Sequence, residues 1–415
     1  MASRARESAS QPAQPAAPRA GRRAVHDTAT AARDGARRRR PRRARPPPGA
    51  RAVIGERLEG KRIVICAGSG GVGKTTTSAA LAMGLAAEGR KVAVVTIDPA
   101  KRLADSLGLE ELGNEPRLVD PTRFAGHGIE MRGELWAMML DAKRTFDELI
   151  GRLAPDDSSR DEVLANRIYQ ELSGAVAGSQ EFTAIAKLYE LDREGGFDAI
   201  VLDTPPSRNA LDFLDAPDRL TGFFEGRALR VLLAPTGLAA KVVGRGTSVV
   251  FGVLKRVTGV DLLQDLSVFF RSLGGLIDGF KERTKGVKDL LADPATTFLV
   301  VTSPEREPVE EAIFFRNKLR DAGLPFGGLI VNRVQPFGTE PADEDELARE
   351  LGDARLAAKV VKTWDETRVL AGRDQAAIKR LKAQTGDSEP VLVPLLEGDV
   401  HDVDGLVAVH AHLFA

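Results

Sequence analysis

Residues 68–75 read Gly-Ser-Gly-Gly-Val-Gly-Lys-Thr and constrain the fold more than any other stretch of the chain. They match the pattern G-x-x-x-x-G-K-[ST], in which a glycine-rich loop joins a strand to a helix. The apolar run 63–67 before the loop predicts a buried parallel strand, and the Ala- and Leu-rich run 76–88 predicts a helix that Gly89 ends. Backbone N–H groups and the helix N-terminus are then expected to attract phosphate.

The side chains of this loop predict a nucleotide site with magnesium. Glycines let the backbone approach phosphate oxygens closely. Lys74 is expected to reach the β- and γ-phosphates, and the Thr75 hydroxyl is expected to hold Mg²⁺. The predicted nucleotide-binding residues of the loop are Gly68, Ser69, Gly70, Gly71, Val72, Gly73, Lys74, Thr75 and Thr76.

Apolar runs and helical patterns alternate along the rest of the chain. This alternation predicts an α/β fold with a doubly wound, mostly parallel sheet flanked by helices, as in P-loop NTPases. Most runs are apolar throughout, as expected for strands that are covered on both faces. The predicted strands are 62–67, 91–97, 134–140, 198–203, 297–302, 327–332 and 391–395, and residues 306–322 are a predicted helix.

Two connections, residues 141–195 and 207–292, are too long for a single helix. The second is rich in Val, Leu and Phe interrupted by charges and glycines, a pattern that predicts several amphipathic helices in an inserted α-helical subdomain. Two interpretations remain open. The helices either pack only on one another, or leave part of their apolar face as a binding groove or membrane-surface patch.

Residues 1–51 differ in composition from the remainder of the chain. They hold 14 arginines and only three acidic residues, with many prolines, so they predict a disordered tail before a folded domain at 52–415. A basic arm that touches lipid or nucleic acid is the alternative. Since the whole chain has 59 basic and 59 acidic residues, the folded part is acidic, which argues against a nucleic-acid partner.

The cysteine content limits the compartment and the chemistry. Cys66 is the single cysteine, so the chain has no internal disulfide, and a reducing cytoplasmic location is expected. No apolar run approaches the roughly 20 residues that span a bilayer.

Two aspartates follow predicted strands and supply the acids that nucleotide hydrolysis needs. Asp98 ends the run 92–97, and Asp203 ends the run 199–202. At the carboxyl edge of a parallel sheet, Asp203 would hold the Mg²⁺ shell as a Walker B acid, and Asp98 would polarise the attacking water. Each acid alone is also explained as a helix-capping turn residue.

Three motifs together resemble the ArsA-type ATPases, which include arsenical-pump and tail-anchored-protein-targeting (guided-entry) ATPases of the deviant Walker A class. They are the loop at 70–76, the Asp-Pro-Ala element within 96–105 and the Asp-Thr-Pro-Pro element within 202–207. Further matches at 329–332 and 393–398 extend the resemblance over about residues 61–410.

The resemblance implies a role for several residues. Asp98 is similar to the switch I aspartate that activates water, and Asp203–Pro206 to the switch II element that senses the γ-phosphate. Asn332 and Pro394 are similar to residues that contact adenine. Catalysis would rest on Asp98 and Lys74, with Mg²⁺ held by Thr75 and Asp203. The family also implies dimers with ATP at the interface and helical subdomains that open and close.

The chain departs from this family pattern at three points. Ser69 stands where the deviant Walker A signature has a lysine that crosses the dimer, so a homodimer lacks that cation. Lys101 and Arg102 are possible substitutes. The cysteine pair that binds zinc between targeting subunits is absent, so no zinc is expected, and the arsenite-binding cysteines of the pump subunit are absent too.

These observations predict a cytoplasmic, Mg²⁺-dependent ATPase of the ArsA type. It would act as a dimeric switch whose helical subdomain binds a hydrophobic client or a membrane partner. One alternative is a nucleotide-binding, weakly hydrolysing half of a heterodimer with an ArsA-type paralogue that carries the lysine. A MinD- or ParA-like positioning ATPase is the other, and the helical inserts and the acidic domain count against it.

Overall fold

The computed structural model describes most of the chain after the arginine-rich segment. The predicted tail at 1–51 and most of the second insert lie outside the described part. The residues that the structure describes are 54–98, 101–167, 169–170, 179–204, 276–336, 343–396, 398, 400 and 402–414.

One eight-stranded sheet in the order β3-β4-β2-β5-β1-β6-β7-β8 forms the centre of the described region. All neighbouring strands are parallel except β3 and β4, which confirms the predicted α/β class and mostly parallel sheet. The strands are β1 (Ile63–Ala67), β2 (Lys91–Thr96), β3 (Arg117–Leu118), β4 (Glu134–Met139), β5 (Ala199–Asp203), β6 (Thr296–Thr302), β7 (Phe326–Val334) and β8 (Val391–Pro394).

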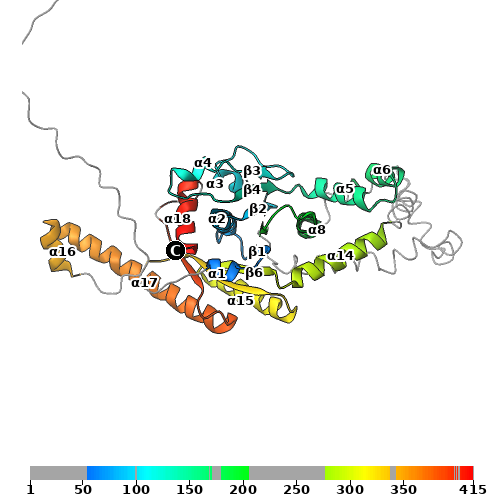
Figure 1. Ribbon diagram of the computed structural model, residues 1–415. Coiled ribbons are helices and arrows are strands. Elements are labelled where there is room, and N and C mark those ends of the chain that lie inside the picture. The colour runs from blue at the N-terminus through cyan, green and yellow to red at the C-terminus, as the bar shows by residue number, and fades with distance from the viewer. Residues whose placement is uncertain are drawn as a thin grey trace, which may run out of the picture. The chain divides into compact units, whose positions relative to one another are not determined.

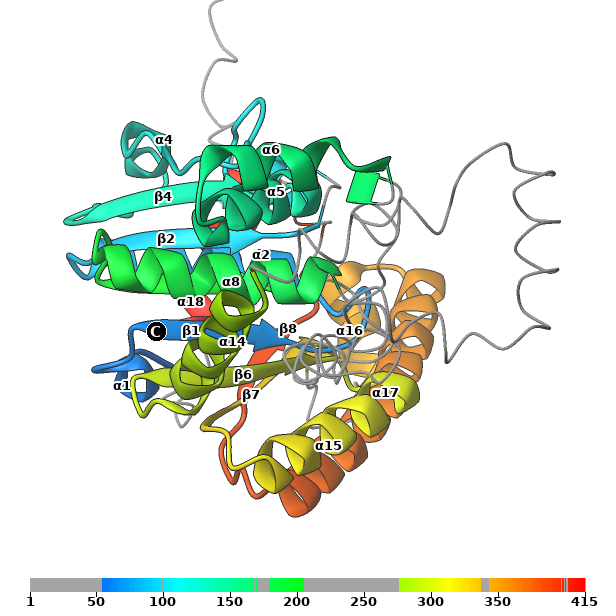
Figure 2. The same cartoon turned by 90° about the vertical axis from the view of Figure 1, so that its right-hand side faces the viewer.

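Helices cover both faces of this sheet (Figures 1 and 2). The helices are α1 (Ile54–Leu58), α2 (Lys74–Ala87), α3 (Arg102–Ser106), α4 (Thr122–Ala125), α5 (Ala142–Leu153), α6 (Asp157–Ala165), α8 (Ser179–Glu194), α14 (Ile277–Ala292), α15 (Arg306–Asp321), α16 (Glu344–Leu351), α17 (Ala354–Thr385) and α18 (Val403–Leu413).

Alternate residues of the central strands enter two separate apolar cores. Val64 and Cys66 face the layer that contains α2 and α18, whereas Ile63 and Ile65 face the layer with α8, α14 and α15. Every residue of β1, β5 and β6 is buried, which is why these strands are apolar without alternation. The order of the strands places β5 between β1 and β2, so the ends of these three strands lie side by side.

Within the first insert the structure describes the helices α5 and α6 and most of α8. Helix α5 packs on α8, and α6 packs on α5. The carboxylate of Glu190 on α8 joins this insert to α14: Arg152 Nη2 lies 2.5 Å from it, Lys187 Nζ lies 2.8 Å from it and Arg283 Nη2 lies 3.4 Å from it. A single buried carboxylate therefore holds cations from three helices. Of the second insert, only its end, α14, lies within the described residues.

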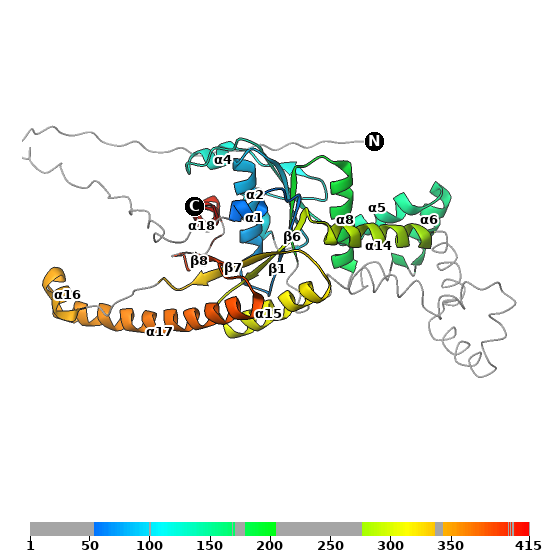
Figure 3. The same cartoon turned by 60° about the horizontal axis from the view of Figure 1, so that its bottom comes forward.

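Helix α17 spans 32 residues and has two different halves. The second half packs on α15, where both Nη atoms of Arg380 bind the Glu310 carboxylate at 2.8 and 2.9 Å. The first half continues past the sheet with α16 folded beside its N-terminal end (Figures 1 and 3). Asp353 caps α17 by accepting from the Leu356 and Arg355 backbone N–H groups.

The sequence patterns did not single out β3, α16 or α17 as separate elements. The strand β3 has only two residues, and α16 and α17 fall between the predicted strands at 327–332 and 391–395. Within the described residues, no helix combines the length and the apolar character needed to cross a membrane.

Candidate nucleotide-binding site

The glycine-rich loop has a backbone that only glycine adopts easily. Gly73 has φ 91° and forms the N-cap of α2, and a Cβ added there would lie 2.3 Å from Asn332 Nδ2. Gly68 has φ 154°, and a Cβ added there would lie 1.9 Å from the Val301 carbonyl oxygen on β6. The loop therefore curls tightly between β1 and α2, with β6 and β7 against its back.

Lys74 begins α2 and is folded back into the loop. Its Nζ donates to the Ser69 carbonyl at 2.7 Å, and the residue is 6% exposed. Burial lowers the pKa of Lys74, although the charges of Asp203 and Asp98 oppose this effect. The ammonium thus lies inside the loop, where water screens its charge little and its attraction for a bound anion is strong.

Asp203 forms the centre of a buried hydrogen-bond chain below the loop. Its Oδ2 accepts from Thr75 Oγ1 at 2.7 Å and from Thr96 Oγ1 at 2.9 Å. Burial raises the pKa of Asp203 to about 6, while these two hydrogen bonds and the charge of Lys74 act against the rise. The other oxygen, Oδ1, is buried and has no hydrogen-bond partner among the described residues.

Asp98 joins the same chain through Thr96, whose Oγ1 also accepts from the Asp98 backbone N–H at 3.2 Å. The Asp98 side chain is 13% exposed, and its Oδ2 lies 3.6 Å from an Nη atom of Arg102. Thr204, the residue after Asp203, donates its hydroxyl to the Cys66 carbonyl at 2.8 Å. The ends of β1, β2 and β5 are therefore connected by hydrogen bonds at the carboxyl edge of the sheet, where ligands of open α/β sheets bind.

A cavity of about 1020 Å³ opens above these strand ends. At one end it is lined by the loop residues Gly71, Gly73, Lys74, Thr75 and Thr76, together with Asp98 and Thr204. At the other end it is lined by residues at and beyond the ends of β7 and β8 and by α18. These residues are Asn332, Arg333, Gln335, Pro394, Leu395, Leu396, Gly398, Val400 and Val409.

The end of β7 is irregular where it meets the cavity. The register between β7 and β8 shifts between Val331 and Val334, and Arg333 has φ 60°, a left-handed conformation that costs free energy in a non-glycine residue. Asn332 Nδ2 donates to the Val72 carbonyl of the loop at 2.9 Å, and its Oδ1 accepts from the Arg333 backbone N–H. The bulge thus holds Asn332 against the loop while Arg333 lines the cavity.

The predicted site residues divide into lining and supporting positions. Eight of them line the cavity: Gly71, Gly73, Lys74, Thr75, Thr76, Asp98, Asn332 and Pro394. Gly68, Ser69, Gly70, Val72 and Asp203 are not among the lining residues, and Ser69 and Asp203 are buried beneath it. Pro205 and Pro206, from the predicted switch II element, lie outside the described residues.

The sequence reasoning missed Thr96 and Arg333. Thr96 is a buried strand residue, and only the pairing of β2 with β5, which places it opposite Asp203, reveals its contact. Arg333 directly follows Asn332, and no local pattern predicts its left-handed backbone. Arg102, considered as a substitute cation, does line the cavity, and Lys101 does not.

The family model for anion-transporting ATPases matches residues 61–369 of the 415-residue chain. The chain belongs to the anion-transporting ATPase (ArsA) family. The match includes the loop, both aspartates, Asn332 and the first half of α17. It therefore covers the loop end of the cavity and stops before β8.

Relatives of this ArsA-family chain carry ATPase names. It is 28% identical to a candidate arsenical pump-driving ATPase 1 of Aquifex aeolicus over 66% of this chain and 64% of that protein. It is 28% identical to ATPase ARSA1 of Chlamydomonas reinhardtii over 83% of this chain and 42% of that protein. It is 26% identical to ATPase GET3 of Chaetomium globosum over 74% and 83%, respectively. The chain thus matches less than two thirds of the first two relatives.

The site fits a magnesium-bound nucleotide by its own chemistry. Ser69 Oγ and Asp203 Oδ1 are buried polar atoms without partners among the described residues, at the two places where a phosphate and a hydrated cation are expected. Thr75 and Asp203 would hold Mg²⁺, which supplies charge to neutralise the phosphates.

Proposed function

We propose that this chain binds Mg²⁺-ATP in the cavity and hydrolyses it to ADP and phosphate, acting as a dimeric switch. The observation that carries the proposal is the hydrogen-bond chain from Thr75 through Asp203 and Thr96 to Asp98, at the end of the cavity that the loop lines. A cation-holding pair and a water-activating carboxylate are the two groups that phosphoryl transfer to water requires.

Each residue has a separate task in this reaction. Lys74 and the loop N–H groups bind the β- and γ-phosphates and balance the charge on the bridging oxygen when it leaves. Asp98 orients the attacking water and accepts its proton. The ion pair with Arg102 keeps the Asp98 carboxylate at the cavity wall. Asn332 and Pro394 hold the base at the opposite end.

The switch depends on the segment that leaves the sheet after Asp203. Thr204 is fixed to the Cys66 carbonyl, and the chain then passes into the second insert and returns as α14. Loss of the γ-phosphate would first change the contacts of Asp203 and Thr204, and the second insert and α14, which follow them in the chain, would move next. We expect the helical subdomain to bind a hydrophobic client or a membrane partner in one state and to release it in the other.

Position 69 is a serine, so the proposed dimer has no lysine there to bring a positive charge to the partner's phosphates. Ser69 can donate a hydrogen bond to a phosphate, because its buried hydroxyl has no partner among the described residues, but it carries no charge. Arg102 and Arg333 both line the cavity and offer charge within one copy. We therefore favour a homodimer in which each site supplies its own cations.

The test is ATP turnover by the full chain with Mg²⁺ over a range of protein concentrations. Specific activity that rises with concentration, and that Asp98→Asn abolishes, is the expected result. If nucleotide binds but turnover stays near zero at every concentration, homodimeric hydrolysis is ruled out.

The second candidate function is the weakly hydrolysing half of a heterodimer, and Ser69 is the observation that favours it. In that case a paralogue with lysine at this position would restore turnover when mixed with this chain. Ser69→Lys would do the same in the homodimer.

A further inference from the structure

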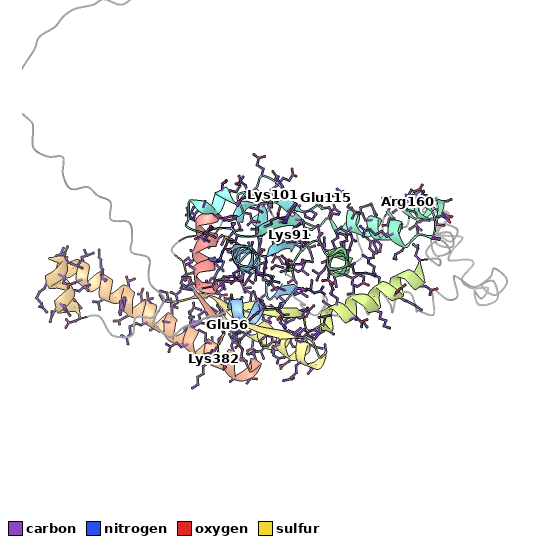
Figure 4. All side chains as sticks on the ribbon, in the orientation of Figure 1. Glu56, Lys91, Lys101, Glu115, Arg160 and Lys382 are labelled. Carbon is purple, nitrogen blue, oxygen red and sulfur yellow. The ribbon has the colours of Figure 1, made fainter. Side chains whose placement is uncertain are left out.

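Arg102 brings a positive charge to the cavity beside Asp98. It is the first residue of α3 and follows Lys101, which Figure 4 labels in the upper part of the described region. Helix α3 packs on α2, the helix that begins at Lys74, and both Arg102 and Asp98 line the cavity. Arg102 Nη1 lies 3.6 Å from Asp98 Oδ2. The guanidinium is therefore next to the carboxylate to which the proposed function assigns the activation of water.

The charged residues around the cavity leave no surplus of positive charge for a nucleotide. Among the described residues that line the cavity or lie directly below the loop, the cations are Lys74, Arg102 and Arg333, and the anions are Asp98, Asp105, Asp203 and Glu305. A triphosphate adds further negative charge, and during transfer this charge is spread over the γ-phosphate oxygens. A cation that approaches these oxygens only during transfer therefore lowers the barrier to hydrolysis.

Of the two arginines that line the cavity among the described residues, Arg102 is at the end where the γ-phosphate is expected. Arg333 follows Asn332 at the β7–β8 end, where the base is expected. Lys101 borders a separate cavity of about 50 Å³ and does not line the nucleotide cavity. Position 69, which holds a lysine in the family signature, is a serine. Arg102 is therefore the side chain that is placed to supply the missing charge.

We propose that Arg102 is a catalytic residue that transfers its ion pair from Asp98 to the γ-phosphate during hydrolysis, within one copy of the chain. The inference rests on the proposed ATPase function and names the cation that acts in place of the family's lysine. The water oxygen bonds to the γ-phosphorus as the bond from that phosphorus to the bridging oxygen breaks. The electron pair of the broken bond stays on ADP beside Lys74, and Asp98 accepts the water proton.

The proton transfer explains why the guanidinium changes its partner. Once Asp98 has accepted the proton it is neutral, so it no longer attracts Arg102. At the same stage the γ-phosphate oxygens carry the negative charge of the transferring group. The Arg102 side chain is 62% exposed, and an exposed ion pair contributes little to stability, so little is lost when the pair opens. The cation is therefore released in the step in which the phosphate needs it.

The experiment compares the full chain with Arg102→Ala by three measurements in the presence of Mg²⁺. They are turnover at saturating ATP, affinity for ATP, and affinity for ADP with aluminium fluoride, which imitates the transferring phosphoryl group. Turnover and affinity for ADP with aluminium fluoride should each fall about 100-fold, while ATP affinity should change less than about threefold. Arg102→Lys keeps a positive charge and should recover about tenfold of each loss.

Lys101→Ala is the matched control, because it removes the neighbouring cation from the same segment. Lys101 is exposed and does not line the nucleotide cavity, so all three quantities should stay within about twofold. Equal losses in Lys101→Ala and Arg102→Ala would show that the overall charge of the segment matters, and the assignment to Arg102 would be wrong.

A double variant separates a direct contact from an effect through Asp98. If Arg102 only holds the Asp98 carboxylate in place, Arg102→Ala should cost no further affinity for ADP with aluminium fluoride once Asp98→Asn is present. The proposal predicts the opposite result. Arg102→Ala should weaken this affinity about as much in the Asp98→Asn chain as in the unchanged chain.

A mixed dimer tests whether Arg102 acts within its own copy. Arg102→Ala and Lys74→Met chains, produced together, should remain as inactive as either variant alone, because each copy lacks one cation of its own site. If Arg102 acted on the partner's nucleotide, a mixed dimer would hold one complete site, and turnover would return. Recovered turnover would therefore overturn the assignment to one copy.

Two further results would overturn the proposal. Turnover is unchanged in Arg102→Ala, or turnover at saturating ATP is unchanged and only ATP affinity falls, as expected for a group that binds the ground state. Failure of the proposed function gives a different result, because the unchanged chain would then bind ATP without hydrolysing it. Its affinity for ADP with aluminium fluoride would still report whether Arg102 contacts the transferring group.

Discussion

At and below the loop end of the cavity, Lys74 and Asp203 are buried and bonded to their neighbours, whereas at the β7–β8 end Asn332, Arg333 and Gln335 are half-buried or exposed. Asp203 is 1% exposed and Lys74 is 6% exposed, and both bind neighbours within the loop or the adjoining strands. Arg333 and Leu395, at the opposite end, are exposed to solvent.

The difference in burial indicates that the loop end keeps a fixed geometry, whereas the β7–β8 end can vary and so determine which base is bound. Groups that are buried and held by hydrogen bonds to neighbouring strands keep one geometry, which is what the transfer of a phosphoryl group needs. Exposed groups on an irregular strand end are easily changed without loss of the core, so this end is where affinity for the base would be tuned. Variants at the loop end should therefore abolish function, and variants at the β7–β8 end should adjust it.

Lys74→Met should have the largest effect. Removal of the only ammonium inside the loop is expected to weaken ATP binding by about 100-fold, and turnover should fall further. Isothermal titration and a phosphate-release assay measure the two quantities. Lys101→Met is the control, since Lys101 is exposed and does not line this cavity.

Asp98→Asn should reduce turnover about 100-fold or more and change ATP affinity by less than about threefold, because in the proposed reaction the carboxylate acts on the water rather than on the ground-state nucleotide. Asp105→Asn, at an exposed residue of the same cavity wall, should leave both values unchanged. Equal losses in the two variants would show that the negative charge of the wall, not Asp98 itself, matters.

Asn332→Ala should weaken ATP binding about tenfold with a small change in turnover at saturating ATP. It removes the predicted base contact and the hydrogen bond to the Val72 carbonyl. Gln335→Ala is the matched change at the same end of the cavity and should cost less than about twofold. A large fall in turnover at saturating ATP for Asn332→Ala would show that the β7–β8 end also contributes to catalysis, contrary to the assignment made here.

Arg333→Gly should have the smallest effect, and it should raise stability while it lowers ATP affinity. Glycine adopts φ 60° without strain, so the free energy of unfolding should rise by about 1 kcal/mol, while ATP affinity should fall about threefold through loss of the cation. Chemical denaturation and titration measure the two. Arg333→Lys keeps the charge and the strain and should change neither by much.

The loop end could be predicted from the sequence because its groups lie within short motifs. Gly68–Thr76 form one continuous stretch, and Asp98 and Asp203 are each marked by the apolar strand before them. The sheet class followed from the same apolar runs. The link through Thr96 could not be predicted, because it depends on β5 lying between β1 and β2, which no local pattern encodes.

The β7–β8 end and helix α17 were less predictable for a different physical reason. The bulge at Asn332 and Arg333 arises from the pairing of two strands that are separated by α16 and α17. On one face of α17, Ile378 and Leu381 are buried, whereas Leu356 and Val360 are exposed. Periodicity identifies a face of a helix, and only the arrangement of the other elements determines what covers that face.

The reaction of Cys66 with a thiol reagent reports how often the central sheet opens. It is the only cysteine in the chain, it is fully buried in β1, and burial raises the pKa of its thiol to about 12. A thiol reagent therefore reacts only when β1 separates from its neighbours. Because the Cys66 carbonyl holds Thr204 beside the cavity, this opening also dismantles the nucleotide site. Bound nucleotide should accordingly slow labelling by the factor 1 + [L]/Kd, so that one thiol reads both the stability of the sheet and the occupancy of the site.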